Sequence, residues 1–177
     1  MKKERSLNLI SSKISLSPIE DEDKANLLRM LQSEAIGKTY MLPVFVDEEQ
    51  KESFFLRLKS LSSDPKRFLY GIRRNEDESL IGMLNEVEKE GSTIEVGYFI
   101  DEDNWGKGYA TEALSLAIEE LFRLGYRRVK AAHFENNLAS AKVMMKAGMH
   151  RNSETSEVEY KGKTYRCIEY VIDKPNK

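Results

Sequence analysis

Cysteine, tryptophan and histidine are scarce: the 177-residue sequence has one cysteine, one tryptophan and two histidines. A single cysteine, Cys167, excludes an internal disulfide bond and a metal site built from several cysteines. We expect it to be a buried, unreactive thiol. The histidines, His133 and His150, stand apart from one another, so we expect no metal ion. Both fit structural roles, and His133, near the end of an expected strand, is also an alternative general base.

Long apolar runs are also absent. The basic start, residues 1–5, is followed by a segment, residues 6–13, that is too polar for a signal peptide, and no stretch is long enough to span a membrane. We therefore expect a cytoplasmic protein. The 28 basic and 30 acidic residues leave a net charge of −2, which creates no overall field for nucleic acid or an anionic membrane. We expect neither as a partner.

The length and composition favour one domain over residues 1–177, because the chain can bury one core but not two. Apolar residues are 40% and charged residues 33% of the sequence, which is typical of a globular protein. No internal repeat, linker or low-complexity segment is visible.

The hydrophobic pattern predicts a mixed α/β (α+β) order of elements. Residues 10–16 alternate as a strand, a helix follows Pro18 and Asp21, and an irregular apolar stretch precedes a second helix at 47–61. Three antiparallel strands follow at 67–73, 80–89 and 93–100, and then a long amphipathic helix at 110–124. A strand at 128–134, a helix at 138–147 and a hairpin that turns around 161–163 come next.

A loop with two glycines joins a strand to the long helix, with Trp-Gly-Lys-Gly-Tyr-Ala-Thr-Glu-Ala at 105–113. Glycines let backbone amides approach a ligand, and the first amides of a helix lack partners and carry the positive dipole end. The loop is therefore typical of an anion site. It lacks the Lys-Ser/Thr ending of a P-loop and the third glycine of a dinucleotide fingerprint.

Three further blocks accompany this loop: Glu-Val-Gly-Tyr at 95–98, Asn137-x-x-Ser140, and Lys-Ala-Gly-Met at 146–149. In this order the chain resembles the GNAT superfamily of acetyl-CoA-dependent N-acetyltransferases, and most of all its branch that acetylates ribosomal-protein N-termini at alanine or serine. The resemblance implies a twisted, mostly antiparallel sheet of six to seven strands, splayed at the fourth and fifth strands, with about four helices. It also implies a monomer or homodimer.

The resemblance implies where acetyl-CoA binds. The pyrophosphate would lie on the backbone amides of Gly106, Lys107, Gly108, Tyr109, Ala110 and Thr111. Asn137 would hold the pantetheine amide. The strand at 95–100 would carry a bulge at Gly97 and pair with the pantetheine arm, and an amide of Phe99 or Ile100 would stabilise the oxyanion. Trp105 departs from the Gln or Arg that usually begins this loop.

The same resemblance gives candidate catalytic residues. Glu95 would be the general base that deprotonates the amine, directly or through water; a solvated carboxylate at the strand end is the alternative. Ser140 would protonate or relay a proton to the coenzyme A thiolate, or else only cap its helix. Met144 occupies the place where many relatives carry a tyrosine proposed as general acid, so that mechanism is excluded here.

The function that follows is transfer of an acetyl group to a primary amine by direct attack in a ternary complex, with a protein N-terminal α-amine as the favoured acceptor. We expect Tyr40, Phe45 and Tyr160 to wall the acceptor pocket. Two alternatives stay open: a small-molecule amine acetyltransferase for polyamines or aminoglycosides, and a coenzyme A-binding module without catalysis. Acidic clusters suit a cationic acceptor, but acidic residues also favour helix starts.

Overall fold

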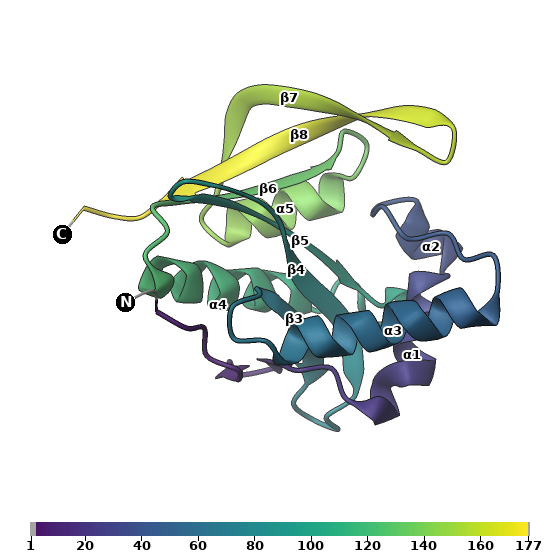
Figure 1. Cartoon of the computed structure of the whole chain (residues 1–177). Helices are drawn as coiled ribbons and strands as arrows, with labels where there is room; N and C mark the ends of the chain where they lie inside the picture. Colours follow the sequence, from purple (N-terminus) through teal and green to yellow (C-terminus); the bar gives the residue numbers. More distant parts are fainter. Residues whose placement is uncertain (1–2, 177) are drawn as a thin grey trace.

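The structure, a computed structural model, describes residues 3–176 as a twisted sheet with helices on both faces (Figure 1). The strand order is β1-β2-β3-β4-β5-β6-β8-β7. All neighbours are antiparallel except β5 and β6. The strands are β1 (Leu9–Ile10), β2 (Ile14–Ser17), β3 (Leu69–Arg74), β4 (Leu80–Glu90), β5 (Thr93–Ile100), β6 (Arg128–Phe134), β7 (His150–Tyr160) and β8 (Lys163–Asp173).

Five α-helices divide between the two faces: α1 (Lys24–Leu31), α2 (Glu34–Gly37), α3 (Glu48–Ser63), α4 (Tyr109–Leu124) and α5 (Leu138–Lys146), with short 3₁₀ turns at Asp21–Asp23 and Glu102–Asn104. The core is accordingly in two main parts. One packs α4 and α5 against the sheet, and the other packs α1, α2 and α3 against the opposite face. The expected mixed fold is confirmed, with eight strands rather than six or seven and one helix more than expected.

The N-terminal strand differs from the prediction. The alternation at 10–16 is interrupted by a tight turn, in which the Ser11 amide donates to the Ile14 carbonyl at 2.9 Å, so the segment forms two strands instead of one. A turn of polar residues can satisfy its own backbone in this way, which hydrophobic periodicity does not reveal. Because β1 adds a strand at the edge, the splay of the sheet falls between the fifth and sixth strands.

The splay between β5 and β6 shapes the molecule. These parallel strands pair from Thr93 to Glu95 on β5 and from Arg128 to Lys130 on β6, and then diverge. The bulge lies elsewhere than predicted: the register shift places the extra residue, Val87, on β4, opposite the step from Glu95 to Val96. Gly97 is therefore not the bulge residue. A bulge increases local twist, and here it faces the segment where β5 leaves β6.

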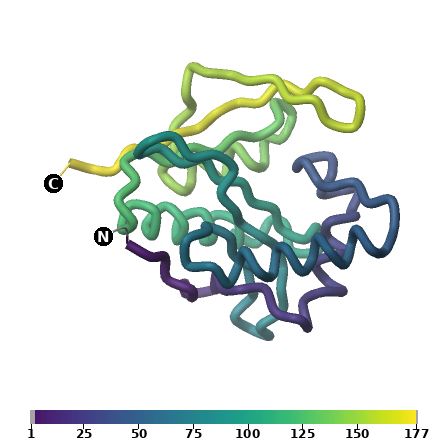
Figure 2. The backbone as a smooth tube through the Cα atoms, viewed as in Figure 1, coloured from purple at the N-terminus to yellow at the C-terminus, as the bar shows by residue number. Residues whose placement is uncertain are grey.

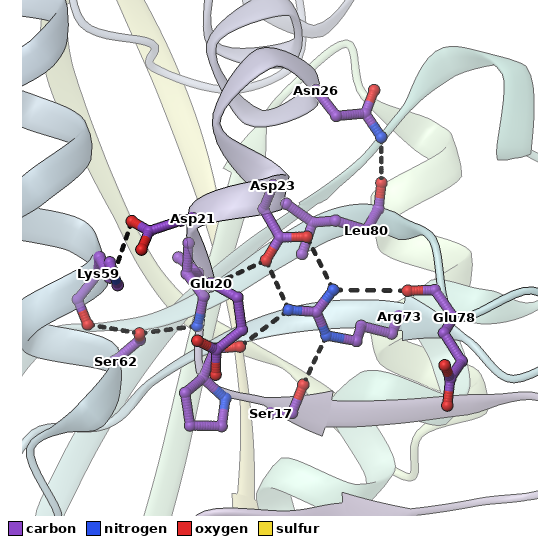
Figure 3. Close-up of polar contacts among 12 residues, drawn as sticks. Ser17, Glu20, Asp21, Asp23, Asn26, Lys59, Ser62, Arg73, Glu78 and Leu80 are labelled. Carbon is purple, nitrogen blue, oxygen red and sulfur yellow. Dashed lines mark hydrogen bonds and ion pairs between the residues drawn. The ribbon is translucent and has the colours of Figure 1, made fainter.

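A buried ion pair joins the start of α1 to the sheet (Figure 3). The guanidinium of Arg73 on β3 contacts both carboxylate oxygens of Asp23, at 2.8 and 2.5 Å, and also bonds Ser17. Asp23 also accepts from the Glu20 amide at 2.7 Å. In the same network, Ser62 on α3 accepts from the Ile19 amide. These bonds hold α1 and α3 in place on this face.

The C-terminal hairpin of β7 and β8 turns at Lys161 and Gly162, whose φ angles are +49° and +73°. Positive φ at both turn residues matches the twist of the flanking strands, so the predicted hairpin is confirmed. Its tip lies on the same side as the loop after α2 (Figure 2). There the Leu42 amide donates to the Tyr160 hydroxyl at 3.2 Å. Within residues 3–176, no helix is long and apolar enough to cross a bilayer.

Candidate functional site

A groove of about 340 Å³ occupies the gap that the splay opens. Its walls come from β5, the loop before α4 and the first turns of α4 and α5, with Thr39 and Tyr40 closing one side. Ten of the predicted site residues line it: Tyr40, Phe99, Ile100, Gly106, Gly108, Tyr109, Ala110, Thr111, Asn137 and Ser140. Residues 60 to 100 positions apart in the sequence thus share one cavity.

The glycine loop opens onto this groove at the start of α4. Gly106 and Gly108 have φ angles of +75° and +83°, a conformation that strains other residues. Gly108 is the N-cap and has no side chain to cap the helix, so the amides of Tyr109, Ala110 and Thr111 are presented to the groove at the positive dipole end. This geometry fits an anion.

Trp105 holds the loop against β5. Its indole Nε1 donates to the carbonyl of Ile100 at 2.7 Å, and its ring is about half exposed. The residue therefore has a backbone-anchoring role where a phosphate-contacting side chain stands in the usual pattern. Lys107, which was predicted to bind the pyrophosphate, does not line the groove, and its ammonium donates to the Asp103 carbonyl at 2.9 Å.

The turn between β1 and β2 braces the same loop. The Glu112 carboxylate accepts from Ser11, Ser12 and the Lys13 amide. Desolvation opposes its ionisation, but these hydrogen bonds prevail and hold the pKa of Glu112 below its usual range. The Lys13 ammonium donates to the Lys107 carbonyl at 3.3 Å. The Lys13 ammonium therefore lies beside the anion site, in addition to Lys142 and Lys146 on the groove wall.

The backbone of β5 offers free amides to the groove. The Asp101 amide donates to the Ile81 carbonyl on β4 at 2.7 Å, and Phe99 lies opposite Met83 in the same register. In an antiparallel pair alternate residues point their amides toward the partner, so Phe99 bonds to β4, whereas Tyr98 and Ile100 direct their amides to the open side. Of the two amides predicted for the oxyanion, the geometry favours that of Ile100.

Ser140, in the first turn of α5, contacts β5 through a tyrosine. The hydroxyl oxygens of Ser140 and Tyr98 are 3.0 Å apart. Asn137 is the N-cap of α5: its Oδ1 accepts from the Ser140 amide at 3.2 Å, and its Nδ2 donates to the Thr39 carbonyl at 3.4 Å. Asn137 thus combines capping with a position on the groove wall.

Gly97 makes room for Tyr40. A β-carbon at Gly97 would lie 2.9 Å from the Tyr40 hydroxyl oxygen and 3.2 Å from Val87. The Tyr40 hydroxyl donates to Asn85 Oδ1 at 3.0 Å, its ring packs on Phe99, and burial raises its pKa to about 12. Tyr40 also lines a second cavity of about 300 Å³ toward α3, so it separates the two spaces.

Glu95 lies on the other face of the sheet from Ser140. Side chains alternate along β5; Val96 and Ile100 belong to the core under α4, so Glu95 points to the face covered by α1, α2 and α3. Desolvation raises the pKa of Glu95, the Lys130 ammonium lowers it, and the carboxylates of Glu169 and Glu88 raise it further. Lys130 itself pairs with Glu169 at 2.6 Å.

Other predicted residues fall outside the groove. Phe45 packs edge-to-face on Phe54 of α3 and lines a separate surface hollow, so it does not join Tyr40. Tyr160 lies in a small cluster with Phe134 and Cys167, next to the loop after α2. Cys167 is buried, as expected, and burial raises the pKa of its thiol.

His133 is buried on β6 and does not line the groove, and within residues 3–176 its Nε2 has no hydrogen-bond partner. Its Nδ1 is 2.7 Å from the Phe134 carbonyl and its ring packs against Tyr170. Among the described residues, three or more His, Cys, Asp or Glu side chains nowhere gather in a way that could hold a metal ion.

Comparison with known proteins agrees with this geometry. A family model described as the acetyltransferase (GNAT) domain matches residues 13–150. The chain belongs to this family and is an acetyl-CoA-dependent N-acetyltransferase. It is 26% identical over 171 residues to the uncharacterized N-acetyltransferase YoaA of Bacillus subtilis, covering 94% of this chain and 97% of the relative.

Solved structures share the fold. A GNAT-family acetyltransferase from Bacillus anthracis has a TM-score of 0.79 at 19% identity, over 94% of this chain and 98% of that one. The ribosomal-protein-S5-alanine acetyltransferase from Vibrio fischeri has a TM-score of 0.76 at 17% identity, over 95% and 97%. At these identities the likeness concerns the fold.

The tertiary structure adds residues that the motifs did not indicate. Tyr98 contacts Ser140, Lys13 lies beside the glycine loop, and Arg29 of α1 pairs with the buried Asp101 just before that loop, at 2.5 Å. The only sequence signal for Tyr98 was its place in the Glu-Val-Gly-Tyr block. Lys13 and Arg29 carried none, because their partners lie 94 and 72 residues away.

Proposed function

We propose that this enzyme acetylates the N-terminal α-amine of a protein. Acetyl-CoA lies in the groove, with its pyrophosphate on the amides at the start of α4 and its pantetheine arm along the free edge of β5. The observation that carries the acceptor proposal is Glu95, a half-buried carboxylate with a raised pKa on the face opposite α4 and α5. A raised pKa makes Glu95 a stronger base than an exposed glutamate, but it remains a weak base beside an amine, so it suits an amine that is easily deprotonated.

The pKa values of the acceptors support this choice. An α-amino group has a pKa of about 8 and a lysine side chain one of about 10.4, so at pH 7 the first is far more often neutral. Glu95 lines neither the groove nor the second cavity, so it would remove a proton from the attacking nitrogen through water. The amide of Ile100 would donate to the oxyanion that forms at the thioester carbonyl.

The acceptor side of the site fits an extended peptide end. The second cavity adjoins the groove at Tyr40, and its wall includes Leu42, Leu58 and Met83, with Arg57, Arg67 and Glu86 at polar positions. We infer that the first side chain of the acceptor enters here. The branch resemblance of the loop at 105–113 and the fold of the Vibrio fischeri enzyme agree with a ribosomal protein as acceptor.

A panel of acceptors tests the proposal. Short peptides with a free N-terminal alanine or serine would be compared with the same peptides after N-terminal blocking but with an internal lysine, and with spermidine and an aminoglycoside. We expect thiol release with the free peptides and a mass gain on their first residue. Turnover of spermidine or the aminoglycoside alone would overturn the acceptor. Binding of acetyl-CoA without turnover of any amine would indicate a module without catalysis.

A further inference from the structure

A hydroxyl pair spans the groove between β5 and α5. Tyr98 Oη and Ser140 Oγ are 3.0 Å apart, and both residues line the groove. Tyr98 lies just before Phe99 and Ile100, on the edge where β5 presents free amides. The pair is therefore at the point where the thioester end of a pantetheine arm would arrive, if acetyl-CoA binds as proposed above.

The surroundings of the pair restrict both side chains. The Ser140 amide is held by Asn137 Oδ1, which fixes the first turn of α5. The Tyr98 ring packs against the core under α4 and α5. Burial raises the pKa of Tyr98 to about 12, so the phenol keeps its proton at neutral pH and is able to donate it in a hydrogen bond.

A serine hydroxyl has one proton and can rotate. If Ser140 donated to Tyr98, that proton would be turned away from the substrate. If Tyr98 donates, the Ser140 oxygen is the acceptor, and the Ser140 proton is free to point into the groove that both residues line.

We propose that Tyr98 is a positioning residue, which donates to the Ser140 oxygen and so points the Ser140 proton at the sulfur of coenzyme A. The inference rests on the proposed use of the groove by acetyl-CoA. Met144, one turn further along α5, is buried in the core and has no proton to offer. The tyrosine hydroxyl on this side of the groove is instead that of Tyr98, on β5.

The chemistry balances as follows. The amine nitrogen forms a bond to the thioester carbon, and the C–S bond then breaks, leaving its electron pair on sulfur. Ser140 donates a hydrogen bond to this developing thiolate. The nitrogen loses one proton in becoming an amide, and the sulfur gains one in becoming a thiol, through the base and solvent. Tyr98 and Ser140 end the cycle as they began it, so no further reactant is required.

A double-mutant cycle tests the coupling. Tyr98→Phe removes only the hydroxyl, and Ser140→Ala removes its partner. Loss of one neutral hydrogen bond predicts a kcat about fivefold lower for Tyr98→Phe, with an unchanged KM for acetyl-CoA. In the Ser140→Ala background the same substitution should have no further effect, because there is nothing left to position. Equal losses in both backgrounds would overturn the proposal.

Tyr70→Phe is the matched control. Tyr70 is a buried tyrosine whose hydroxyl donates to the Ser6 carbonyl at 2.6 Å, in the core and outside the groove-lining set. Its substitution should lower the unfolding temperature but leave kcat unchanged. If Tyr98→Phe lowered kcat only as much as Tyr70→Phe, a general loss of packing would explain both.

A binding measurement makes the test independent of the acceptor. Calorimetry would compare coenzyme A with desulfo-coenzyme A, which lacks the sulfur, from pH 6 to 9. A donor at the sulfur favours the thiolate, so the affinity ratio should begin to rise below the free thiol pKa of about 8.5. Tyr98→Phe should shift this rise toward that of Ser140→Ala, and an unshifted profile would overturn the role of Tyr98. If coenzyme A did not bind the wild-type protein at all, the proposed function would fail first, and the role of Tyr98 with it.

Discussion

The Tyr40 hydroxyl occupies the space that a side chain at Gly97 would need, since a β-carbon there would lie only 2.9 Å away. Gly97 is on β5 and Tyr40 follows α2, yet together they form the partition between the groove and the second cavity. The glycine is required by this contact, and not by a positive φ or a bulge.

Gly97→Ala should disturb this partition. Overpacking of a filled site costs typically about 1–3 kcal/mol, partly offset by the smaller entropy of the unfolded chain. We expect a loss of about 1 kcal/mol in the free energy of unfolding and a higher KM for the acceptor. Chemical denaturation and steady-state kinetics measure the two. Adding Tyr40→Phe removes the closest atom, so the alanine should then cost less; an equal cost in both backgrounds would show that another contact is responsible.

Gly108→Val should weaken acetyl-CoA binding. The residue has φ +83° and begins α4, so a β-branched side chain strains the loop and displaces its amides. Losing a single charge-assisted hydrogen bond to phosphate predicts affinity at least about tenfold lower. Gly91→Val is the control, because Gly91 also has a positive φ, +58°, in the β4–β5 turn, outside the groove. Both variants should lose stability, and only Gly108→Val should lose affinity by calorimetry.

Glu95→Gln should slow acetylation and remove the acidic limb of the rate profile. Desolvation is the main cause that raises the pKa of Glu95. In the wild type, kcat/KM should therefore decrease as the pH is lowered, with an apparent pKa above that of an exposed glutamate. Removing a general base typically costs about a hundredfold or more in rate. A glutamine variant with the wild-type rate and profile would exclude Glu95 as the base.

The stability of the same variant should change in the opposite direction. A raised pKa means that the folded protein holds the proton more tightly than the unfolded chain does. Ionisation of Glu95 therefore costs stability at neutral pH, and the cost disappears as the pH falls below the ordinary glutamate pKa of about 4.3. Glu95→Gln should be more stable than the wild type at pH 7 and equal to it near pH 4. Denaturation curves at the two pH values measure this. A variant less stable than the wild type at pH 7 would show that the sign is wrong, and the same difference at both pH values would show that the pKa of Glu95 is not shifted by folding.

Asp23→Ala should destabilise the protein strongly, because it leaves the Arg73 guanidinium without its carboxylate. The Asp23 side chain is 6% exposed and that of Arg73 15%; removing one partner of a buried pair costs about 3–5 kcal/mol. Asp21→Ala is the matched control, since its carboxylate is 77% exposed and pairs with Lys59 at the surface, where such pairs contribute about 0–1 kcal/mol. Similar losses for both, measured by denaturation, would contradict the buried role.

The elements with strong local signals were predictable. The helix from Tyr109 to Leu124 shows unbroken apolar periodicity and ends at Gly125, whose φ is +105°. The Lys161-Gly162 turn and the meander of β3, β4 and β5 also follow from local residue types. The Ser11–Lys13 turn and the short α2 did not, since they depend on a few backbone hydrogen bonds with no hydrophobic period.

The candidate site divides in the same way. The glycine loop and the capping Asn137 are sequence-local features, and they predicted the groove wall. Phe45 was predicted to line the acceptor pocket because it is an apolar residue in a loop. Such a residue can pack toward a pocket or against a nearby helix, and here it packs on Phe54 of α3. The bulge was predicted at Gly97 because glycine favours bulges, whereas the register places it at Val87 of the partner strand.

The sequence by itself indicated the kind of enzyme, because the loop at 105–113 and the three blocks around it together resemble one family, whereas the loop alone indicates only an anion site. The tertiary structure decided which side chains share the groove. Tyr98 and Ser140 are 42 residues apart and Tyr40 and Gly97 are 57 apart. Such contacts depend on how β5 and β6 diverge and how α5 packs on them, and these are properties of the whole core rather than of any local pattern.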